Sequence, residues 1–514
     1  MRKITWVITL SLTSILTCFT ITADAVIPQL LGPLTALMSI IPQILAFVGV
    51  AIITSLVFAR DTTKLVFYKI RNFFSLKRVM TLLITLVVLI GIAVLTYQIV
   101  VRTVGSPTPT VVDENGNRDD TNAVTGTPWP TFRFNANRTG HADTLPGPES
   151  PIPAWIFRDK GLKTVQFHSS PAVVGNRLYI AAAVGAVFST SGATYCIDID
   201  TQEVIWRHDS DIPIFSSPAV VAGRVYIGEG FHYDDNCSLR CLDAKTGDPI
   251  WSFKTTSHVE STPFITKGRL YFTAGADGVY CLDALAGEEI WHYPAVHADM
   301  APLVKDGKVF FGTGYDDYLI IAVDAETGSE IWSRQMPYQV WGSPSAYQDI
   351  VIFGLGMGNF AESAPIPKGK VVAVNANTGD TVWEYPVGDA IMSAMVIYKD
   401  HVIFGSRDGH VYSLTAEGEL RWKKPMGGVV VSSPAVAHDA IYAATGSETA
   451  SNKIYSLSIF DGSINWEYDS VEVKYGLKFY SSPAIVNGKL YIGSSDRYIF
   501  CLGGSNTTRK VEDR

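Results

Sequence analysis

Residues that could carry chemistry are few in this 514-residue sequence, and most lie outside any catalytic spacing. Asp234-Asp235-Asn236 and Asp316-Asp317 offer the oxygen ligands that Ca²⁺ binds, but neither has the ligand spacing of an EF-hand loop. Both fall where a hairpin is expected, so we favour acidic turns. The sequence contains no His-Glu-x-x-His, Walker loop or Gly-x-Ser-x-Gly. We therefore predict no catalytic residue and no metal site.

The six cysteines are too few for a disulfide framework. Four of them occupy one repeated position, just before a Leu-Asp turn or its counterpart: Cys196, Cys241, Cys281 and Cys501. Equivalent positions in different repeats lie far apart, so we expect small buried thiols. Cys237 and Cys241 would be about 13 Å apart on one extended strand, which is too far for a disulfide unless Asn236–Leu239 forms a loop.

The elements that position these residues are eight copies of one unit. Each unit begins with Ser-Ser-Pro-Ala or a variant, continues through a hairpin, and ends near Leu-Asp-Ala-x-Thr-Gly and a Trp. The starts lie 39 to 50 residues apart, at Ser169, Ser216, Ser261, Met300, Gly342, Met392, Ser432 and Ser481. Tight turns between runs that alternate in strand fashion predict one four-stranded antiparallel sheet per unit.

The two ends of the repeat array complement each other. The last unit reaches Cys501-Leu502 without a following Trp strand, whereas Pro153–Arg158 is a Trp strand that precedes the first unit. We predict that this N-terminal strand closes an all-β, eight-bladed β-propeller over residues 151–505, followed by a tail at 506–514. Eight tryptophans are then expected to dock between blades: Trp155, Trp206, Trp251, Trp291, Trp332, Trp383, Trp422 and Trp466.

The residue just before each innermost strand of a propeller can point into the axial funnel. Here those residues are His168, Phe215, Glu260, Asp299, Trp341, Ile391, Val431 and Tyr480. Five of them are candidate ligand-binding residues: His168, Glu260, Asp299, Trp341 and Tyr480. Glu260 and Asp299 could hold a cation while Trp341 stacks on a planar ring. The alternative, which we favour, is a plugged and partly wet channel.

The repeated unit and its Trp resemble the blade of the pyrroloquinoline-quinone (PQQ) repeat family, found in quinoprotein dehydrogenases and in BamB-type assembly proteins. The stretch from Trp129 to Gly140 is similar to the lead-in before such propellers. The resemblance implies the fold but leaves enzyme and scaffold open, because both use this blade. The sequence lacks the adjacent cysteines that many quinoprotein alcohol dehydrogenases place beside the cofactor. Its repeat units also lack the long insertions that usually cover the site in a quinoprotein. We therefore expect no cofactor, with PQQ and calcium as the alternative.

The N-terminal region has the features of a membrane segment. Residues 1–25 have a basic start, an apolar run and an Ala-x-Ala end, typical of a secretory signal peptide or, alternatively, an uncleaved anchor. Within residues 26–102, the stretches 42–59 and 79–101 are uncharged and each long enough for one transmembrane helix. The basic loop between them, residues 60–78, is predicted to stay in the cytoplasm, which places the propeller on the periplasmic side of the cytoplasmic membrane.

A linker at residues 103–150 joins this region to the propeller. Its Trp129–Gly140 part is expected to dock on the propeller or to bind a partner. Residues 103–514 carry a net charge of −15, which argues against nucleic-acid binding. We predict a non-enzymatic, membrane-tethered scaffold that binds other cell-envelope proteins. The alternatives are a PQQ-dependent quinoprotein dehydrogenase and a ligand-binding sensor module.

Overall fold

The computed structural model describes residues 129–133, 140–142 and 146–505, apart from residues 163, 186–190, 233, 296, 316, 360–361, 447–451 and 470–477. The predicted signal peptide or anchor, both predicted transmembrane helices and the tail lie outside these residues. Within the described ranges every element is a β-strand, and no helix has the length and hydropathy needed to cross a membrane.

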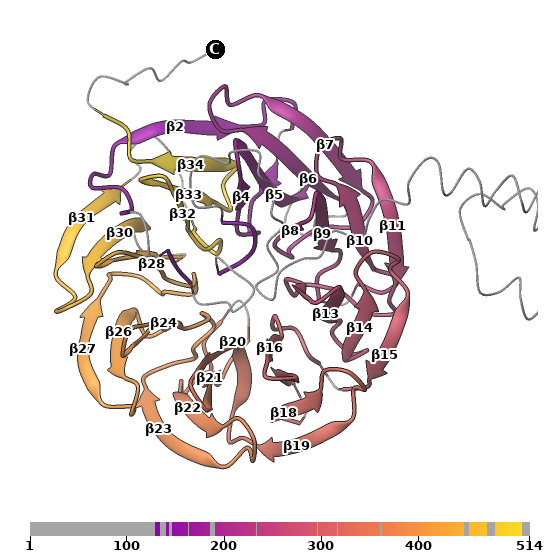
Figure 1. The fold of residues 1–514 in the computed structure, drawn as a ribbon. Coiled ribbons are helices and arrows are strands. Elements are labelled where there is room, and N and C mark those ends of the chain that lie inside the picture. Colours follow the sequence, from indigo (N-terminus) through magenta and orange to yellow (C-terminus); the bar gives the residue numbers. More distant parts are fainter. Residues whose placement is uncertain are drawn as a thin grey trace, which may run out of the picture. The chain divides into compact units, whose positions relative to one another are not determined.

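Eight sheets surround a central axis (Figure 1), each with four antiparallel strands that form one blade, which confirms the predicted eight-bladed β-propeller. Blades 1 and 2 contain β4 (Ala172–Val174), β5 (Arg177–Val184), β6 (Ser191–Asp198) and β7 (Val204–Ser210), then β8 (Ala219–Val221), β9 (Arg224–Gly228), β10 (Ser238–Asp243) and β11 (Pro249–Lys254). Blades 3 and 4 contain β12 (Phe264–Thr266), β13 (Arg269–Thr273), β14 (Val279–Asp283) and β15 (Glu289–Tyr293), then β16 (Leu303–Lys305), β17 (Lys308–Gly312), β18 (Leu319–Asp324) and β19 (Glu330–Gln335). Blades 5 and 6 contain β20 (Gln339–Tyr347), β21 (Ile350–Gly356), β22 (Gly369–Asn375) and β23 (Thr381–Val387), then β24 (Val396–Tyr398), β25 (His401–Gly405), β26 (His410–Thr415) and β27 (Leu420–Pro425). Blades 7 and 8 contain β28 (Ala435–Ala437), β29 (Ala440–Ala444), β30 (Lys453–Ser458) and β31 (Ile464–Asp469), then β32 (Ala484–Val486), β33 (Lys489–Gly493), β34 (Tyr498–Leu502) and, from the other end of the chain, β2 (Pro153–Arg158). Two sheets have a fifth strand: β3 (Val165–Gln166) pairs with β5 in blade 1, and β1 (His141–Ala142) pairs in parallel with β28 in blade 7.

The N-terminal strand β2 is the outermost strand of blade 8. It pairs antiparallel with β34, with Trp155 opposite Cys501 and Arg158 opposite Tyr498. The Trp155 indole donates to the Ile199 carbonyl of blade 1 at 3.1 Å, and the Ser482 amide donates to Ser170 Oγ at 2.9 Å. Blades 8 and 1 are therefore joined at both the outer and the inner strands.

The Ser-Ser motif has a different partner for each serine. The first serine accepts a hydrogen bond within its own blade, as Ser261 Oγ does from the Thr273 amide at 3.0 Å. The second links neighbouring blades, as Ser217 Oγ does by accepting from the Ser170 amide at 2.8 Å. Where both contacts form, the two serines fix an inner strand to its own sheet and to the neighbouring blade, whereas Ser432 Oγ of blade 7 has no hydrogen-bond partner among the described residues.

The tryptophans pack between blades as expected. Seven of the eight donate from Nε1 to a backbone carbonyl of the neighbouring blade or its lead-in, as Trp332 does to Ala376 at 3.1 Å. Trp251 Nε1 has no hydrogen-bond partner among the described residues. The Thr-Gly glycine of the next blade lies against the ring, and a Cβ at Gly379 would come within 2.6 Å of Trp332. Gly379 also has a φ of 72°, which favours glycine, so both the close contact with the ring and the backbone conformation call for glycine at this position.

The repeated cysteine position lies directly opposite the docking Trp on the paired strand. Cys196 pairs with Trp206, Cys241 with Trp251 and Cys281 with Trp291, and Ala or Ser takes this place in blades 4 to 7. A small side chain is needed there because the indole covers it. All five cysteines that the structure describes are buried and unbridged, Cys237 included, so the expected thiols are confirmed.

The described parts of the Trp129–Gly140 stretch dock on the propeller. Trp129 is buried and exchanges two backbone hydrogen bonds of 2.7 Å with Val173. The buried Arg133 guanidinium donates to the Met395 carbonyl. β1 (His141–Ala142) then adds in parallel to β28 of blade 7. The lead-in therefore contacts blades 1, 6 and 7.

Candidate functional site

One cavity of about 210 Å³ lies on the axis and is bounded by residues of all eight blades. It is lined by all five candidate ligand-binding residues and by two further members of the predicted axial ring: His168, Phe215, Glu260, Asp299, Trp341, Val431 and Tyr480. The exception is Ile391. Its side chain covers Gly354 of β21, as Val259 and Val340 cover Gly228 and Gly312, and Met392 takes the axial place. The repeat in blade 6 therefore starts one residue later than the sequence suggested.

The polar part of this cavity is built by loops at one end of blades 2, 3 and 4. In a four-stranded antiparallel blade, the connection between the second and third strands and the exit from the fourth strand lie at the same end. His232 lies between β9 and β10, whereas His258 and Glu260 lie between β11 and β12. His297 and Asp299 lie between β15 and β16. Three consecutive blades thus bring these side chains together.

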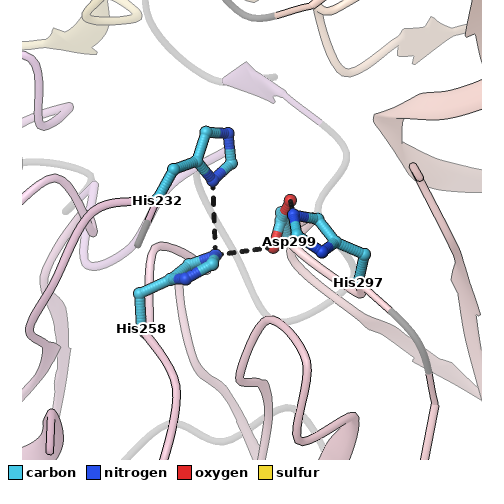
Figure 2. A group of neighbouring side chains, drawn as sticks. All are labelled: His232, His258, His297 and Asp299. Carbon is cyan, nitrogen blue, oxygen red and sulfur yellow. Dashed lines mark hydrogen bonds and ion pairs between the residues drawn. The ribbon is translucent and has the colours of Figure 1, made fainter. Parts of the chain in front are cut away.

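Three imidazoles and one carboxylate converge here (Figure 2), with one possible ligand atom from each within 4.8 Å of the others. His258 Nε2 lies 2.9 Å from Asp299 Oδ1 and 3.4 Å from His232 Nδ1. His297 Nε2 lies 3.8 Å from Asp299 Oδ2, and Glu260 Oε1 lies 3.2 Å from His232 Nδ1. We call His232, His258, His297 and Asp299 the funnel cluster.

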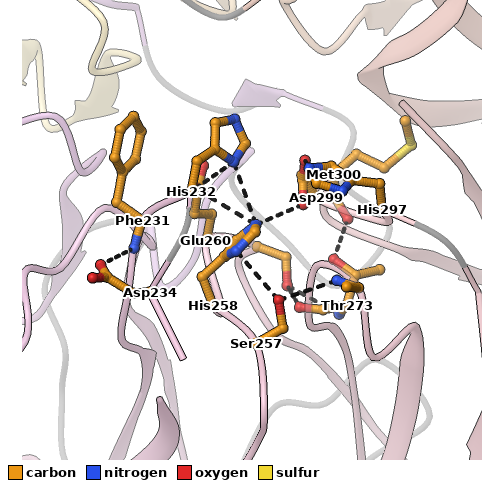
Figure 3. A network of polar contacts seen from close by, with 12 residues as sticks. Phe231, His232, Asp234, Ser257, His258, Glu260, Thr273, His297, Asp299 and Met300 are labelled. Atoms are coloured by element: carbon orange, nitrogen blue, oxygen red, sulfur yellow. Dashed lines mark hydrogen bonds and ion pairs between the residues drawn. The ribbon is translucent and has the colours of Figure 1, made fainter. Parts of the chain in front are cut away.

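His258 is the best-fixed member of the funnel cluster. A Cβ at Gly275 would come within 2.6 Å of the His258 ring, and a Cβ at Gly230 would come within 2.8 Å of the His258 Cβ. The absence of a side chain at these two glycines therefore makes room for His258. Ser257 Oγ accepts from the Ala276 amide at 3.1 Å and lies 3.4 Å from His258 Nδ1 (Figure 3). These contacts hold Nε2 toward Asp299 and His232.

The wall beside His232 includes one of the two acidic sequences. Asp234 accepts from the Phe231 amide at 2.8 Å, and Asn236 has a φ of 58°. The acidic turn expected at residues 234–236 is therefore confirmed. Of the second acidic sequence, residue 316 lies outside the described ranges.

Burial and ion pairing act against each other in this cluster. Burial alone would lower the pKa of His258 and raise the pKa of Asp299. Their mutual hydrogen bond and opposite charges outweigh burial, so the pKa of His258 is raised and the pKa of Asp299 is lowered. Burial raises the pKa of Glu260 to about 8, and the Asp299 charge acts in the same direction. Burial lowers the pKa of His232. The structure therefore favours an imidazolium–carboxylate pair between His258 and Asp299, with Glu260 as a second, poorly solvated acid.

The other candidate residues flank the funnel cluster around the ring, with Trp341 in blade 5 and with Tyr480 and His168 in blades 8 and 1. Burial, followed by the charge of Lys478, lowers the pKa of His168 to about 4, so its ring is neutral and stacks loosely between Phe215 and Tyr480 at 5.0 and 5.3 Å. Trp341 contacts Tyr315 edge-on, with ring centroids 5.2 Å apart. Its buried Nε1 has no hydrogen-bond partner among the described residues.

Sequence reasoning missed the three histidines of the funnel cluster. Two of them carried a signal, because His258-Val259-Glu260 and His297-Ala298-Asp299 repeat a His-x-acid pattern at equivalent positions of adjacent blades. His232 had no such signal, since it lies in the hairpin whose length varies most between repeats. The expectation of no metal site follows from the spacing of the acidic residues alone, which does not show that these histidines converge.

Glu229 fixes the loops that carry the cluster. Its carboxylate is fully buried, and Oε1 accepts from Ser210 Oγ and from Arg240 Nε, both at 2.5 Å. Its backbone carbonyl accepts from the Val259 amide at 2.7 Å, next to His258 and Glu260. The Glu229 carboxylate therefore ties the β9–β10 hairpin to β7 and β10, and its backbone carbonyl ties the hairpin to the loop that leads to the next blade.

We expect Glu229→Gln to lower the free energy of unfolding by about 1–3 kcal/mol, because the Arg240 guanidinium loses its anionic partner and keeps only a hydrogen bond to a neutral amide. Urea denaturation of the full chain measures this. Glu326→Gln is the matched control, since Glu326 pairs with Arg269 but its side chain is 67% exposed. It should change stability by less than about 1 kcal/mol. Equal effects would mean that burial of Glu229 does not strengthen its ion pair.

The PQQ repeat raises the question of whether these residues suit a calcium-bound quinone. Ca²⁺ takes about six to eight oxygen ligands, whereas the two carboxylates here are already placed against imidazole nitrogens. The cavity of about 210 Å³ is also smaller than the roughly 300 Å³ at which pockets for organic ligands begin. The donor set and the space do not fit this cofactor.

The comparisons with known proteins point to the same repeat family. A family model described as outer membrane protein assembly factor BamB matches residues 153–266, 235–396 and 367–508. The quinohemoprotein alcohol dehydrogenase ADH IIB of Pseudomonas putida is 28% identical over 194 residues, which cover 34% of this chain and 26% of the relative. The BamB of Yersinia pestis is 26% identical over 141 residues, which cover 25% of this chain and 35% of the relative. This chain thus spans about a quarter to a third of the length of these two relatives.

Solved structures show the same fold. The BamB of Moraxella catarrhalis superposes with a TM-score of 0.52 at 18% identity, over 69% of this chain and 98% of that one. The quinohemoprotein alcohol dehydrogenase of Comamonas testosteroni gives 0.54 at 13% identity, over 74% and 81%. At such identities the likeness concerns the fold alone.

Proposed function

This chain belongs to the BamB-type family of PQQ-like β-propellers, and from that premise we propose that it is a non-enzymatic protein-interaction scaffold of the cell envelope. Its N-terminal region tethers it to the cytoplasmic membrane through two transmembrane helices. Its propeller lies on the periplasmic side and binds other envelope proteins through its faces.

The observation that carries this proposal is the filling of the axial funnel. The place where a propeller enzyme would bind an organic cofactor is occupied by the funnel cluster and Glu260, whose polar atoms contact one another. Little more than 200 Å³ remains. A funnel of this kind supports a role in holding the ring together, which leaves binding to the outer surfaces of the blades.

The proposed topology has a direct test. We expect protease added to spheroplasts to digest the chain beyond Gly105, because the basic loop at residues 60–78 stays in the cytoplasm. Immunoblotting against the propeller reads out the result, and a cytoplasmic protein that stays intact is the control for sealed membranes. Protection of the propeller in spheroplasts, with cleavage only after lysis, contradicts the topology.

The proposal also predicts that the full chain neither binds PQQ tightly nor oxidises alcohols or sugars. Calorimetric titration of PQQ into the calcium-loaded protein should show no submicromolar binding, because the cavity is small and its acids are paired. A dye-reduction assay over alcohols and aldoses should stay at background.

Two variants make this outcome decisive. Tight PQQ binding that Trp341→Ala abolishes and Trp422→Ala preserves, together with dye reduction, would replace the scaffold by a quinoprotein dehydrogenase. Trp422 is the control because it is a docking residue on the outer strand of blade 6, away from the cavity lining.

A further inference from the structure

The funnel cluster has the composition of a metal site. Imidazole nitrogen and carboxylate oxygen are the ligands of Zn²⁺ and related divalent transition metals, which bind four such groups in a tetrahedron. His232, His258, His297 and Asp299 supply four groups with ligand atoms within 4.8 Å of one another. They come from three adjacent blades, and Figure 2 shows their rings and carboxylate turned toward one space.

The distances are those of a site that needs little movement to close. In a tetrahedron with bonds of about 2.0–2.1 Å, neighbouring ligand atoms are about 3.4 Å apart. His232 Nδ1 and His258 Nε2 are 3.4 Å apart, and His258 Nε2 and Asp299 Oδ1 are 2.9 Å apart. His297 Nε2 lies 3.8 Å from the other carboxylate oxygen, Asp299 Oδ2, and its ligand atom is within 4.8 Å of the other three, so a rotation of its side chain would bring it to the ion.

Two further observations point to a bound cation. Asp299 Oδ2 is buried and has no hydrogen-bond partner among the described residues. Glu260 Oε1 is also buried and lies 3.2 Å from His232 Nδ1, the atom that would bind the ion. The second ring nitrogen of His258 lies beside Ser257 Oγ, the kind of contact that orients a metal-binding imidazole.

We propose that His232, His258, His297 and Asp299 bind one divalent transition-metal ion, with Zn²⁺ as the reference ion and Glu260 as a charged neighbour that does not need to ligate. Four protein ligands leave no open position on a tetrahedral ion, which is the arrangement of structural rather than catalytic zinc sites. The ion clasps blades 2, 3 and 4 at the mouth of the funnel. This site does not depend on the scaffold role, which stands or falls on topology and partners.

The test uses the full chain in detergent, purified through a tag without histidines. The protein is stripped with a chelator, reloaded with Zn²⁺, passed over a desalting column and analysed for metal by mass spectrometry. We expect one Zn²⁺ per chain, and Co²⁺ in its place should give the intense visible absorption of a tetrahedral site. Thermal unfolding should shift upward with Zn²⁺, because the ion binds only the folded ring.

The variants separate this site from adventitious binding. His232→Gln and His297→Gln should each weaken Zn²⁺ binding at least about 100-fold, since loss of a ligand costs no less than the 10–100-fold of an outer contact. Glu260→Gln should weaken binding by about 10-fold and keep the tetrahedral Co²⁺ spectrum. His438→Gln is the matched control, because that side chain is 67% exposed and far from the cluster in the sequence, and its metal content should equal that of the unchanged chain.

Circular dichroism shows whether each variant is folded. A folded, unchanged chain that retains no Zn²⁺ and gives no tetrahedral Co²⁺ bands overturns the proposal, whatever the variants do. So does Zn²⁺ that His232→Gln and His297→Gln retain in full.

Discussion

Deletion of residues 151–160 is expected to open the propeller ring and make the protein aggregate. These residues contain β2, and without it β34 becomes an exposed edge with the backbone of Tyr498–Leu502 unpaired. The deletion also removes Trp155, whose ring packs on Tyr491 and whose indole reaches blade 1. Size-exclusion chromatography with light scattering, on the full chain in detergent, measures the change.

A relocation control separates loss of the strand from loss of the residues. If residues 151–160 are deleted from their place and added after Ser505, the strand follows β34 through a short turn, as in the other seven blades. This variant should regain the monomeric size and most of the melting temperature. A deletion variant that is monomeric with unchanged melting would show that the ring does not need β2.

Trp332→Ala is expected to lower the free energy of unfolding by about 3–5 kcal/mol, the cost of truncating a large buried aromatic residue. Trp332 is 5% exposed, donates to the Ala376 carbonyl at 3.1 Å and covers Gly379 of the next blade. Its removal opens a cavity between blades 4 and 5 and leaves that carbonyl without its indole donor.

Guanidinium denaturation of the full chain measures the loss. Ile331→Ala is the matched control, because this neighbour on the same strand is 41% exposed and should change stability by about 0.5 kcal/mol or less. If both variants lose the same stability, the tryptophan does not dock the blades in the way its contacts indicate.

The sequence predicted those features that each blade repeats. Trp332 and Ser261 recur because every blade must bind its neighbour through the same contacts, and eight copies make such a pattern readable. The fold class and the buried cysteines opposite Trp followed from this and are confirmed. Glu260 and Asp299 could also be placed on adjacent blades, since their position relative to the Ser-Ser start is constant.

What the sequence did not predict depends on contacts that no repeat shares. His232 belongs to a hairpin of unusual length, so nothing in its neighbourhood showed that it reaches His258. Ile391 was assigned to the axis because the start of blade 6 lacks the Ser-Ser pair, and the packing over Gly354 moves that assignment by one residue. Trp251 forms no indole hydrogen bond among the described residues although its motif matches the others, and nothing in the structure explains the difference, because the Ala244 carbonyl accepts from both Tyr179 and Trp206.

The pairing of β2 with β34 also sets the order of events during synthesis. Arg158 leaves the ribosome about 340 residues before its partner Tyr498, which at 5–20 residues per second is a delay of roughly 20–70 s. Throughout that time the nascent chain holds a finished strand with no sheet to join, and a growing arc of blades with an open side. The ring can close only after the last blade has been made, so the open edges of the arc are most exposed to misassembly while the chain is still being synthesised.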